Sequence, residues 1–343
     1  MKSKIRFWGM GIGLLAVVLL LFSCKSGQFH NRGKYAIIMK SRNNWYNELA
    51  GEGFRQVIEE EGENSIILYP DSPAAQEQIR LIKNLTDEKV EAIAVAANDE
   101  YALSTALKEA REKDISVITL DADVETGSRS IYISPVDAEQ LGRDLVKEVY
   151  DICGHRGQWA ILSAGSRSAN QNEWIHTMKK ELQEPLYQEM RLVDIVFGEG
   201  EYGRAAEKAR LLLDTYPDLK VVCCVSTEGI RAAADVVKER GDERKVKIIG
   251  VGLPDQMEQY VGSGPEDVCP VLYIWDPRDL GRLAGYISLE LTRGGGEKLE
   301  KGEIILGGRS YRLDYGWDGG LEVIAGEPIR IDSGNIGYWK DKI

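Results

Sequence analysis

Histidine and metal-binding cysteine patterns are scarce in this sequence. The 343-residue chain has three histidines, His30, His155 and His176, and none of its five cysteines forms a Cys-x-x-Cys pair. The residues that usually hold zinc are therefore scarce, and we expect no bound metal. The sequence also offers no Ser-His-Asp set and little for acid–base catalysis, so we predict that the chain is not an enzyme.

Phosphate-binding loops and basic clusters are scarce as well. No Gly-x-Gly-x-x-Gly follows a predicted strand, and the glycine run at 294–296 follows a predicted helix, so we expect no nucleotide cofactor. Lysine and arginine number 43 against 55 acidic residues, for a formal net charge of -12. Such an acidic chain argues against a nucleic-acid partner, because phosphate binding requires clustered cations.

The N-terminus has the form of an export signal. Lys2, Lys4 and Arg6 precede an uncharged, mostly apolar run over residues 7–24, which ends Leu-Phe-Ser-Cys. This ending resembles a bacterial lipobox, so we predict a signal peptide at 1–23, a lipid on Cys24 and a linker over 24–33. An uncleaved anchor is the alternative, since the run is near the lower limit for spanning a bilayer. Both readings place the body outside the cytoplasm, because the positive flank stays inside.

Four cysteines follow the export segment: Cys153, Cys223, Cys224 and Cys269. An exported location permits disulfides, and spacing alone does not give their connectivity. Cys223 and Cys224 lie in an apolar run and should point to opposite faces of a strand. We favour buried thiols over disulfides.

From Tyr35 onward, short β-rich runs alternate with amphipathic helical stretches. The predicted strands cover 35–40, 65–69, 92–96, 117–120, 131–134, 159–162, 191–197, 220–225, 246–251 and 271–275. The predicted helices cover 46–61, 73–85, 99–113, 137–150, 170–182, 202–216, 227–240 and 277–293. This alternation predicts an α/β fold with parallel sheets covered on both faces. About ten strands exceed one ordinary sheet, so we predict two doubly wound lobes.

Nine short segments, in order, carry a resemblance to a known family. They are Asn44-Trp45-Tyr46, Thr119 to Asp123, Arg129 to Ile133, Leu141-Gly142, Asn170 to Trp174, Tyr216 to Leu219, Trp275-Asp276-Pro277, Leu280-Gly281 and Asp332 to Ile336. Together they resemble the type I periplasmic-binding-protein fold, and in particular the rhamnose-binding and autoinducer-2-binding proteins of sugar-type ABC importers. The likeness covers residues 34 to 343.

The resemblance implies two lobes joined by three crossings, near Ser134, near Trp275 and in the tail after Gly302. It assigns 34–134 plus 277–302 to lobe I, and 135–276 plus 303–343 to lobe II and a crossover tail. It implies a monomer that binds a sugar-like small molecule, a rhamnose-type sugar being favoured, and that serves an ABC permease and ATPase. The protein would lie outside the cytoplasm, anchored to the cell membrane as a lipoprotein.

Candidate ligand contacts follow the predicted strand ends, where open α/β sheets bind ligands. Carboxylates and amides suit a polyhydroxylated ligand, and aromatic rings suit the apolar face of a sugar. Lys40, Trp45 and Tyr46 follow the first strand, and a lysine at this place touches the ligand in the autoinducer-2 binders. Asp121 and Asp123 follow the fourth strand and should point the same way if the chain there is extended; turn or cap chemistry is their other reading.

The second lobe supplies the remaining candidates. Asn170 and Gln171 precede a helix, where the autoinducer-2 binders carry Asp-Gln, although an asparagine there is also a common cap. Ser226 and Thr227 follow the eighth strand, where those proteins have a different tripeptide. Both departures favour a sugar over autoinducer-2. Asp276 follows Trp275 at a crossing and either contacts ligand or stiffens the hinge. Three further residues are expected in the wall of the site: Arg42, Trp174 and Glu228.

Two alternative functions stay open at this stage. The first is an autoinducer-2-binding protein, and the second is a subunit that presents ligand to a membrane sensor kinase. The sequence of the clamp would look the same in an importer and in a sensor. Neighbouring genes would separate them, since an importer requires permease and ATPase genes whereas a sensor requires a kinase gene alone.

Overall fold

The computed structural model describes residues 33–293 and 299–343. The predicted signal peptide and Cys24 lie outside these ranges. Within them, no helix is both long enough and apolar enough to cross a membrane.

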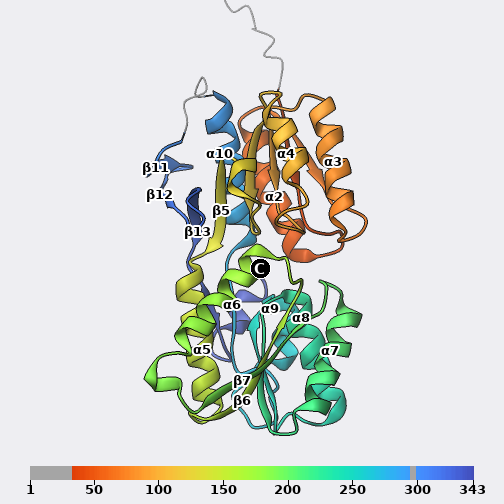
Figure 1. Cartoon of the computed structure of the whole chain (residues 1–343), viewed down its shortest axis with the longest axis vertical. Helices are drawn as coiled ribbons and strands as arrows, with labels where there is room; N and C mark the ends of the chain where they lie inside the picture. Colours follow the sequence, from red (N-terminus) through yellow and green to blue (C-terminus); the bar gives the residue numbers. More distant parts are fainter. Residues whose placement is uncertain (1–32, 294–298) are drawn as a thin grey trace, which may run out of the picture. The chain divides into compact units, whose positions relative to one another are not determined.

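The first sheet has eight strands, most of them parallel. They are β1 (Lys34–Ile38), β2 (Asn64–Leu68), β3 (Ala92–Val95), β4 (Ser116–Leu120), β5 (Ile131–Val136), β11 (Gly302–Leu306), β12 (Arg309–Tyr315) and β13 (Leu321–Gly326). Their order is β11-β12-β13-β5-β4-β3-β1-β2, and among these described strands β12 alone runs in the opposite direction to the others. Figure 1 shows this sheet flanked by its helices: α2 (Trp45–Glu60), α3 (Ala75–Asp87), α4 (Ser104–Arg111) and α10 (Pro277–Arg293).

Helices cover both faces of the first sheet because its central strands are apolar on both sides. On β1, Ile37 faces the core beneath α2 and α10, while Ile38 faces the separate core beneath α3 and α4. Helices α2 and α10 approach closely at Gly281, where an added Cβ would lie 1.9 Å from the carbonyl oxygen of Ala50. This contact fixes α2, whose first turn carries candidate ligand residues.

The second sheet has six strands in the order β14-β10-β9-β8-β6-β7. They are β6 (Gly157–Ser163), β7 (Met190–Phe197), β8 (Leu219–Cys224), β9 (Lys247–Val251), β10 (Leu272–Ile274) and the antiparallel β14 (Ile329–Ile331). Its helices are α5 (Ala138–Ile152), α6 (Ala169–Glu181), α7 (Tyr202–Thr215), α8 (Thr227–Arg240), and the short α9 (Pro254–Met257) and α11 (Ile336–Trp339). Helix α5 packs with α6, and α7 packs with α8. The two sheets and their helices confirm the predicted α/β architecture, and we call them lobe I and lobe II.

The C-terminal tail differs from its expected place. We assigned 303–343 to lobe II and a crossover, whereas β11, β12 and β13 extend the lobe I sheet and only β14 joins lobe II. The reason is the free edge of β5, along which β13 pairs in parallel register, for example Val323 with Ile133. Leu321, Val323 and Ala325 alternate inward on β13 and bury that edge. The chain therefore passes between the lobes after β5, after β10 and after β13.

The four described cysteines are free and buried, as predicted. Burial raises the pKa of Cys153 to about 11 and the pKa of Cys223 and Cys269 to about 12. At neutral pH these thiols are therefore protonated and act as small apolar side chains.

Candidate ligand-binding site

A cavity of about 400 Å³ lies where strand ends of both lobes meet. Lobe I contributes residues that follow β1, β3 and β4, and lobe II contributes residues that follow β6, β7 and β8. The carboxyl ends of parallel strands lie at one edge of a sheet, which is where open α/β sheets bind ligands. The volume lies within the range of small-molecule pockets, about 300–1,000 Å³.

A buried glutamine fixes the lobe I strand ends that reach this cavity. The Gln78 Nε2 donates to the carbonyl oxygens of Met39 (3.2 Å) and Ala96 (2.7 Å), and its Oε1 accepts from the Asn98 backbone N–H. The Asn98 Nδ2 in turn donates to the Lys40 carbonyl oxygen at 2.9 Å. The ends of β1 and β3 are thus tied together, so that Lys40 and Asn98 both face the cavity.

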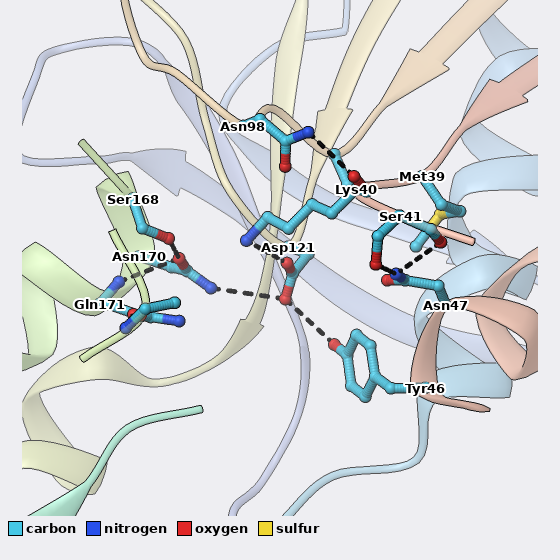
Figure 2. A network of polar contacts seen from close by, with 12 residues as sticks. Met39, Lys40, Ser41, Tyr46, Asn47, Asn98, Asp121, Ser168, Asn170 and Gln171 are labelled. Atoms are coloured by element: carbon cyan, nitrogen blue, oxygen red, sulfur yellow. Dashed lines mark hydrogen bonds and ion pairs between the residues drawn. The ribbon is translucent and has the colours of Figure 1, made fainter. Parts of the chain in front are cut away.

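Asp121 accepts from three side chains that come from different segments (Figure 2). The Lys40 Nζ lies 2.7 Å from its Oδ2, the Tyr46 hydroxyl donates to its Oδ1 at 3.1 Å, and the Asn170 Nδ2 donates to the same oxygen at 3.4 Å. The Asn170 contact joins lobe II to lobe I across the cavity. A ligand hydroxyl that enters here would meet a carboxylate already aligned by its neighbours, which favours a charge-assisted hydrogen bond.

The backbone around Asp121 holds its side chain in this position. Asp121 has a φ of 61°, in the left-handed region that aspartate tolerates better than most residues. Its N–H donates to the carbonyl oxygen of Ile133, and its own carbonyl oxygen accepts from the Tyr132 hydroxyl at 2.9 Å. The strand therefore ends at Leu120, and the carboxylate turns into the gap between the lobes.

Aromatic rings form one side of the cavity. The Trp275 Nε1 donates to the Tyr46 hydroxyl at 2.6 Å, and the Trp275 ring packs edge-to-face on Tyr46 and on Trp174, with centroids 6.1 and 5.4 Å apart. Burial and the neighbouring Asp121 carboxylate raise the pKa of Tyr46 well above its usual value, so its hydroxyl stays a donor. This wall offers apolar and aromatic surface for the less polar face of a ligand.

Lobe II presents amides from the start of α6. The Gln171 Oε1 accepts from the Ser163 hydroxyl (2.7 Å) and the Ala164 N–H (2.8 Å), which ties α6 to the end of β6. The Asn170 Oδ1 accepts from the Ser168 hydroxyl and the Gln171 N–H. These bonds orient the Asn170 amide so that its nitrogen points toward lobe I (Figure 2).

Seven of the ten residues expected to bind ligand line this one cavity. They are Lys40, Tyr46, Asp121, Asn170, Gln171, Ser226 and Thr227. Ser226 also caps α8, because its hydroxyl accepts from the Gly229 N–H. Of the three further residues expected in the wall, Trp174 and Glu228 line the cavity as well.

The other expected residues lie elsewhere. Asp123 pairs with Arg129 and lines a second cavity, because the left-handed turn at Asp121 ends the extended stretch on which both acids would face one way. Asp276 accepts from the Arg278 N–H at the start of α10, and Trp45 is 43% exposed. Neither is among the residues that line the first cavity, and neither is Arg42.

Several polar lining residues were not indicated by the sequence. They are Asn44, Asn47, Asn98, Ser168, Glu199, Glu201 and Arg204. Asn98 lies three residues after the last residue of β3, so the strand-end rule that selected Lys40 applies to it as well. Asn44 is the N-cap of α2, because its Oδ1 accepts from the Asn47 N–H. This capping role alone explains an asparagine at that position in the sequence. Arg204 lies in the first turn of α7, where no local pattern separates a cavity residue from a solvated one.

Two α/β lobes that enclose a polar, aromatic-walled cavity define a small-molecule binding protein. A family model described as periplasmic binding protein domain matches residues 35–297. The chain belongs to this family.

Solved structures support the same assignment. The chain is 36% identical to an ABC transporter solute-binding protein from Clostridium phytofermentas with bound L-rhamnose, with a TM-score of 0.88, covering 91% of this chain and 99% of that one. It is 27% identical to a sugar ABC transporter protein from Actinomyces odontolyticus (TM-score 0.69, 90% and 97% covered). At 20% identity it shares the fold of LsrB from Clostridium saccharobutylicum in complex with AI-2 (TM-score 0.81, 89% and 99% covered).

Proposed function

We propose that the chain is the extracytoplasmic sugar-binding component of an ABC importer and that its ligand is a rhamnose-type sugar. The observation that carries this proposal is the convergence of Lys40, Tyr46 and Asn170 on the Asp121 carboxylate at the meeting point of two lobes. The relative at 36% identity was solved with L-rhamnose bound, which supports the choice of sugar.

Binding would proceed by hinged closure of the two lobes. The ligand hydroxyls would exchange bonds with Asp121 from lobe I and Asn170 from lobe II, while the ring packs against Trp174 and Trp275. A ligand that contacts both lobes binds the closed form more tightly than the open form, and this difference drives closure. The importer's permease and ATPase would then recognise the closed form.

The proposal includes the cellular location. The positive N-terminus, the apolar run and Cys24 support a lipoprotein anchored outside the cytoplasm, with the described residues acting as a monomer. Growth on radiolabelled palmitate tests this part: label should enter the wild-type chain and be absent from Cys24→Ser. Label at equal level in both chains would contradict lipidation at Cys24.

A thermal-shift panel tests the ligand assignment. L-rhamnose, L-fucose, D-arabinose, D-glucose and autoinducer-2 are each added to the purified protein, since a ligand that binds only the folded state raises the unfolding temperature by mass action. We expect the largest shift with L-rhamnose. A shift with autoinducer-2 alone would replace the sugar by that ligand, and no shift with any compound would contradict the binding function.

A further inference from the structure

A second cavity, of about 360 Å³, lies between lobe I and the start of α6. Asn170 lines both this cavity and the first one. Among the described residues that line the second cavity there is no lysine, arginine or histidine, whereas six are acidic: Glu100, Asp123, Glu125, Glu173, Asp318 and Glu322. The acidic residues come from both lobes, because Glu173 lies on α6 and the other five belong to lobe I.

Nearby cations engage three of these carboxylates. Arg129, whose side chain is 1% exposed, pairs with Asp123 at 2.5 Å and with Asp318 at 2.9 Å. Lys108 of α4 lies 3.9 Å from Glu125. Asp123 and Asp318 are therefore held as an ion-paired group on the lobe I side of the cavity.

Glu173 of lobe II and Glu322 of lobe I line this same cavity, and the negative charge of Glu322 acts on Glu173. Burial first, and then the negative charges of Glu322, Asp123, Asp137 and Asp318, raise the pKa of Glu173 to about 7. Burial and the carboxylates of Asp123 and Asp318 also raise the pKa of Glu322 to about 7, against the opposing effects of Ser134 and Arg129.

Two further groups contribute to the surroundings of this pair. Burial first, and then the charges of nearby acids including Asp123 and Asp99, raise the pKa of Glu100. The Tyr132 phenol, which also lines the cavity, stays neutral because burial raises its pKa well above its usual value. Neither group supplies a positive charge to Glu173 or Glu322.

We propose that lobe closure is coupled to proton uptake by the Glu173–Glu322 pair, so that ligand affinity rises as the pH falls from 8 to 6. Closure brings Glu173 on α6 into the cavity that Glu322 and the other lobe I acids line, whereas separation of the lobes moves Glu173 away from those charges and into water. Repulsion between two partly buried like charges disfavours the closed form until one of them is protonated. The inference rests on the hinged closure of the proposed function.

The sign and size of the effect follow from proton linkage. The pair binds a proton more tightly in the closed form, so closure is most favoured at low pH and loses this advantage as the pH rises through about 7. For one shared proton whose pKa moves from the ordinary glutamate value of 4.5 to about 7 on closure, the closed-to-open ratio changes up to about tenfold between pH 8 and pH 6.

The decisive experiment measures closure without ligand. In the full-length chain in detergent, carrying Cys24→Ser, spin labels are placed on cysteines introduced at exposed positions of α3 and α7 (Lys83→Cys and Leu211→Cys), and the distance distribution is recorded at pH 6 and pH 8. The four described cysteines are buried and should not take up label. We expect the short-distance population to increase at pH 6 by up to about tenfold relative to the long-distance population.

Matched variants separate the pair from general pH effects. Glu173→Gln should give the pH 6 distribution at both pH values, and Glu322→Gln provides the same test from lobe I. Glu207→Gln, on the exposed side of α7, should behave as wild type. A wild-type distribution that is the same at both pH values, or a pH response that survives both variants, would overturn the coupling.

Titration of the same proteins with L-rhamnose keeps this inference distinct from the sugar assignment. The dissociation constant should fall by the same factor between pH 8 and pH 6 in wild type and stay constant in Glu173→Gln. A pH-dependent distance distribution without L-rhamnose binding would overturn the ligand assignment and leave the coupling intact. L-rhamnose binding that does not depend on pH would overturn the coupling and leave the ligand assignment intact.

Discussion

Replacing Asp121 with asparagine removes the charge on which the proposed site is centred and preserves the shape of the side chain. The backbone at this position has a φ of 61°, which asparagine adopts as readily as aspartate, whereas alanine would add strain. In the variant, the new amide nitrogen is a donor facing three other donors, from Lys40, Tyr46 and Asn170. The side chain can then accept with one oxygen only.

The size of the effect follows from the exposure of the partners. The Asp121 side chain is 7% exposed and the Lys40 side chain 21%, so the pair is largely but not fully removed from water. A hydrogen bond to a charged group contributes about 1.5–3 kcal/mol. Because Lys40 keeps some solvent, we expect the lower part of that range, about 1.5–2 kcal/mol. Ligand should then bind about 10- to 30-fold more weakly.

Isothermal titration with L-rhamnose at pH 7.5 measures this change. Asp114→Asn is the matched control, because Asp114 also has a φ of 61° but lies exposed between α4 and β4. The control should bind like wild type. If Asp121→Asn keeps a native unfolding temperature and binds within about threefold of wild type, then the Asp121 carboxylate does not hold the ligand.

Two substitutions and one thiol-reactivity measurement test other parts of the proposed structure and function. Arg167→Gln removes the 2.6 Å ion pair with Asp99 between the lobes; because Arg167 is 67% exposed, affinity should fall by less than about fivefold, and the loss should vanish in 1 M salt. Arg129→Met leaves Asp123 and Asp318 without their buried cation, so urea denaturation should show about 3–5 kcal/mol lower stability, and an unchanged midpoint would contradict this. The buried thiols should react with a thiol reagent at pH 7 only after unfolding, and fast reaction of the native protein would contradict their burial.

The sequence predicts the strands and helices well wherever their signals are local. Residues 202–216, for example, were expected to form a helix, and α7 spans Tyr202–Thr215. The tail could not be placed in the same way. The alternating pattern of β13 identifies a strand, but its partner β5 lies far away in the sequence, and local periodicity does not say which sheet edge is free.

The same distinction between local signals and distant partners applies to the residues of the candidate site. Lys40 and Asp121 follow buried strands, so topology alone brings them to the edge where they meet. Asp123 shows where that reasoning stops, since a single left-handed residue turned it toward Arg129. Arg204 reaches the cavity from the first turn of α7, and only the packing of α7 within lobe II decides that placement.

The central claim is that residues of both lobes hold one sugar in the 400 Å³ cavity. A crystal structure of the protein grown with L-rhamnose tests it most directly. We expect the sugar in that cavity, with hydroxyls within hydrogen-bond distance of Asp121 and Asn170 and its ring against Trp174 or Trp275. Density for the sugar at another place, or a cavity without sugar at saturating L-rhamnose, would contradict the account.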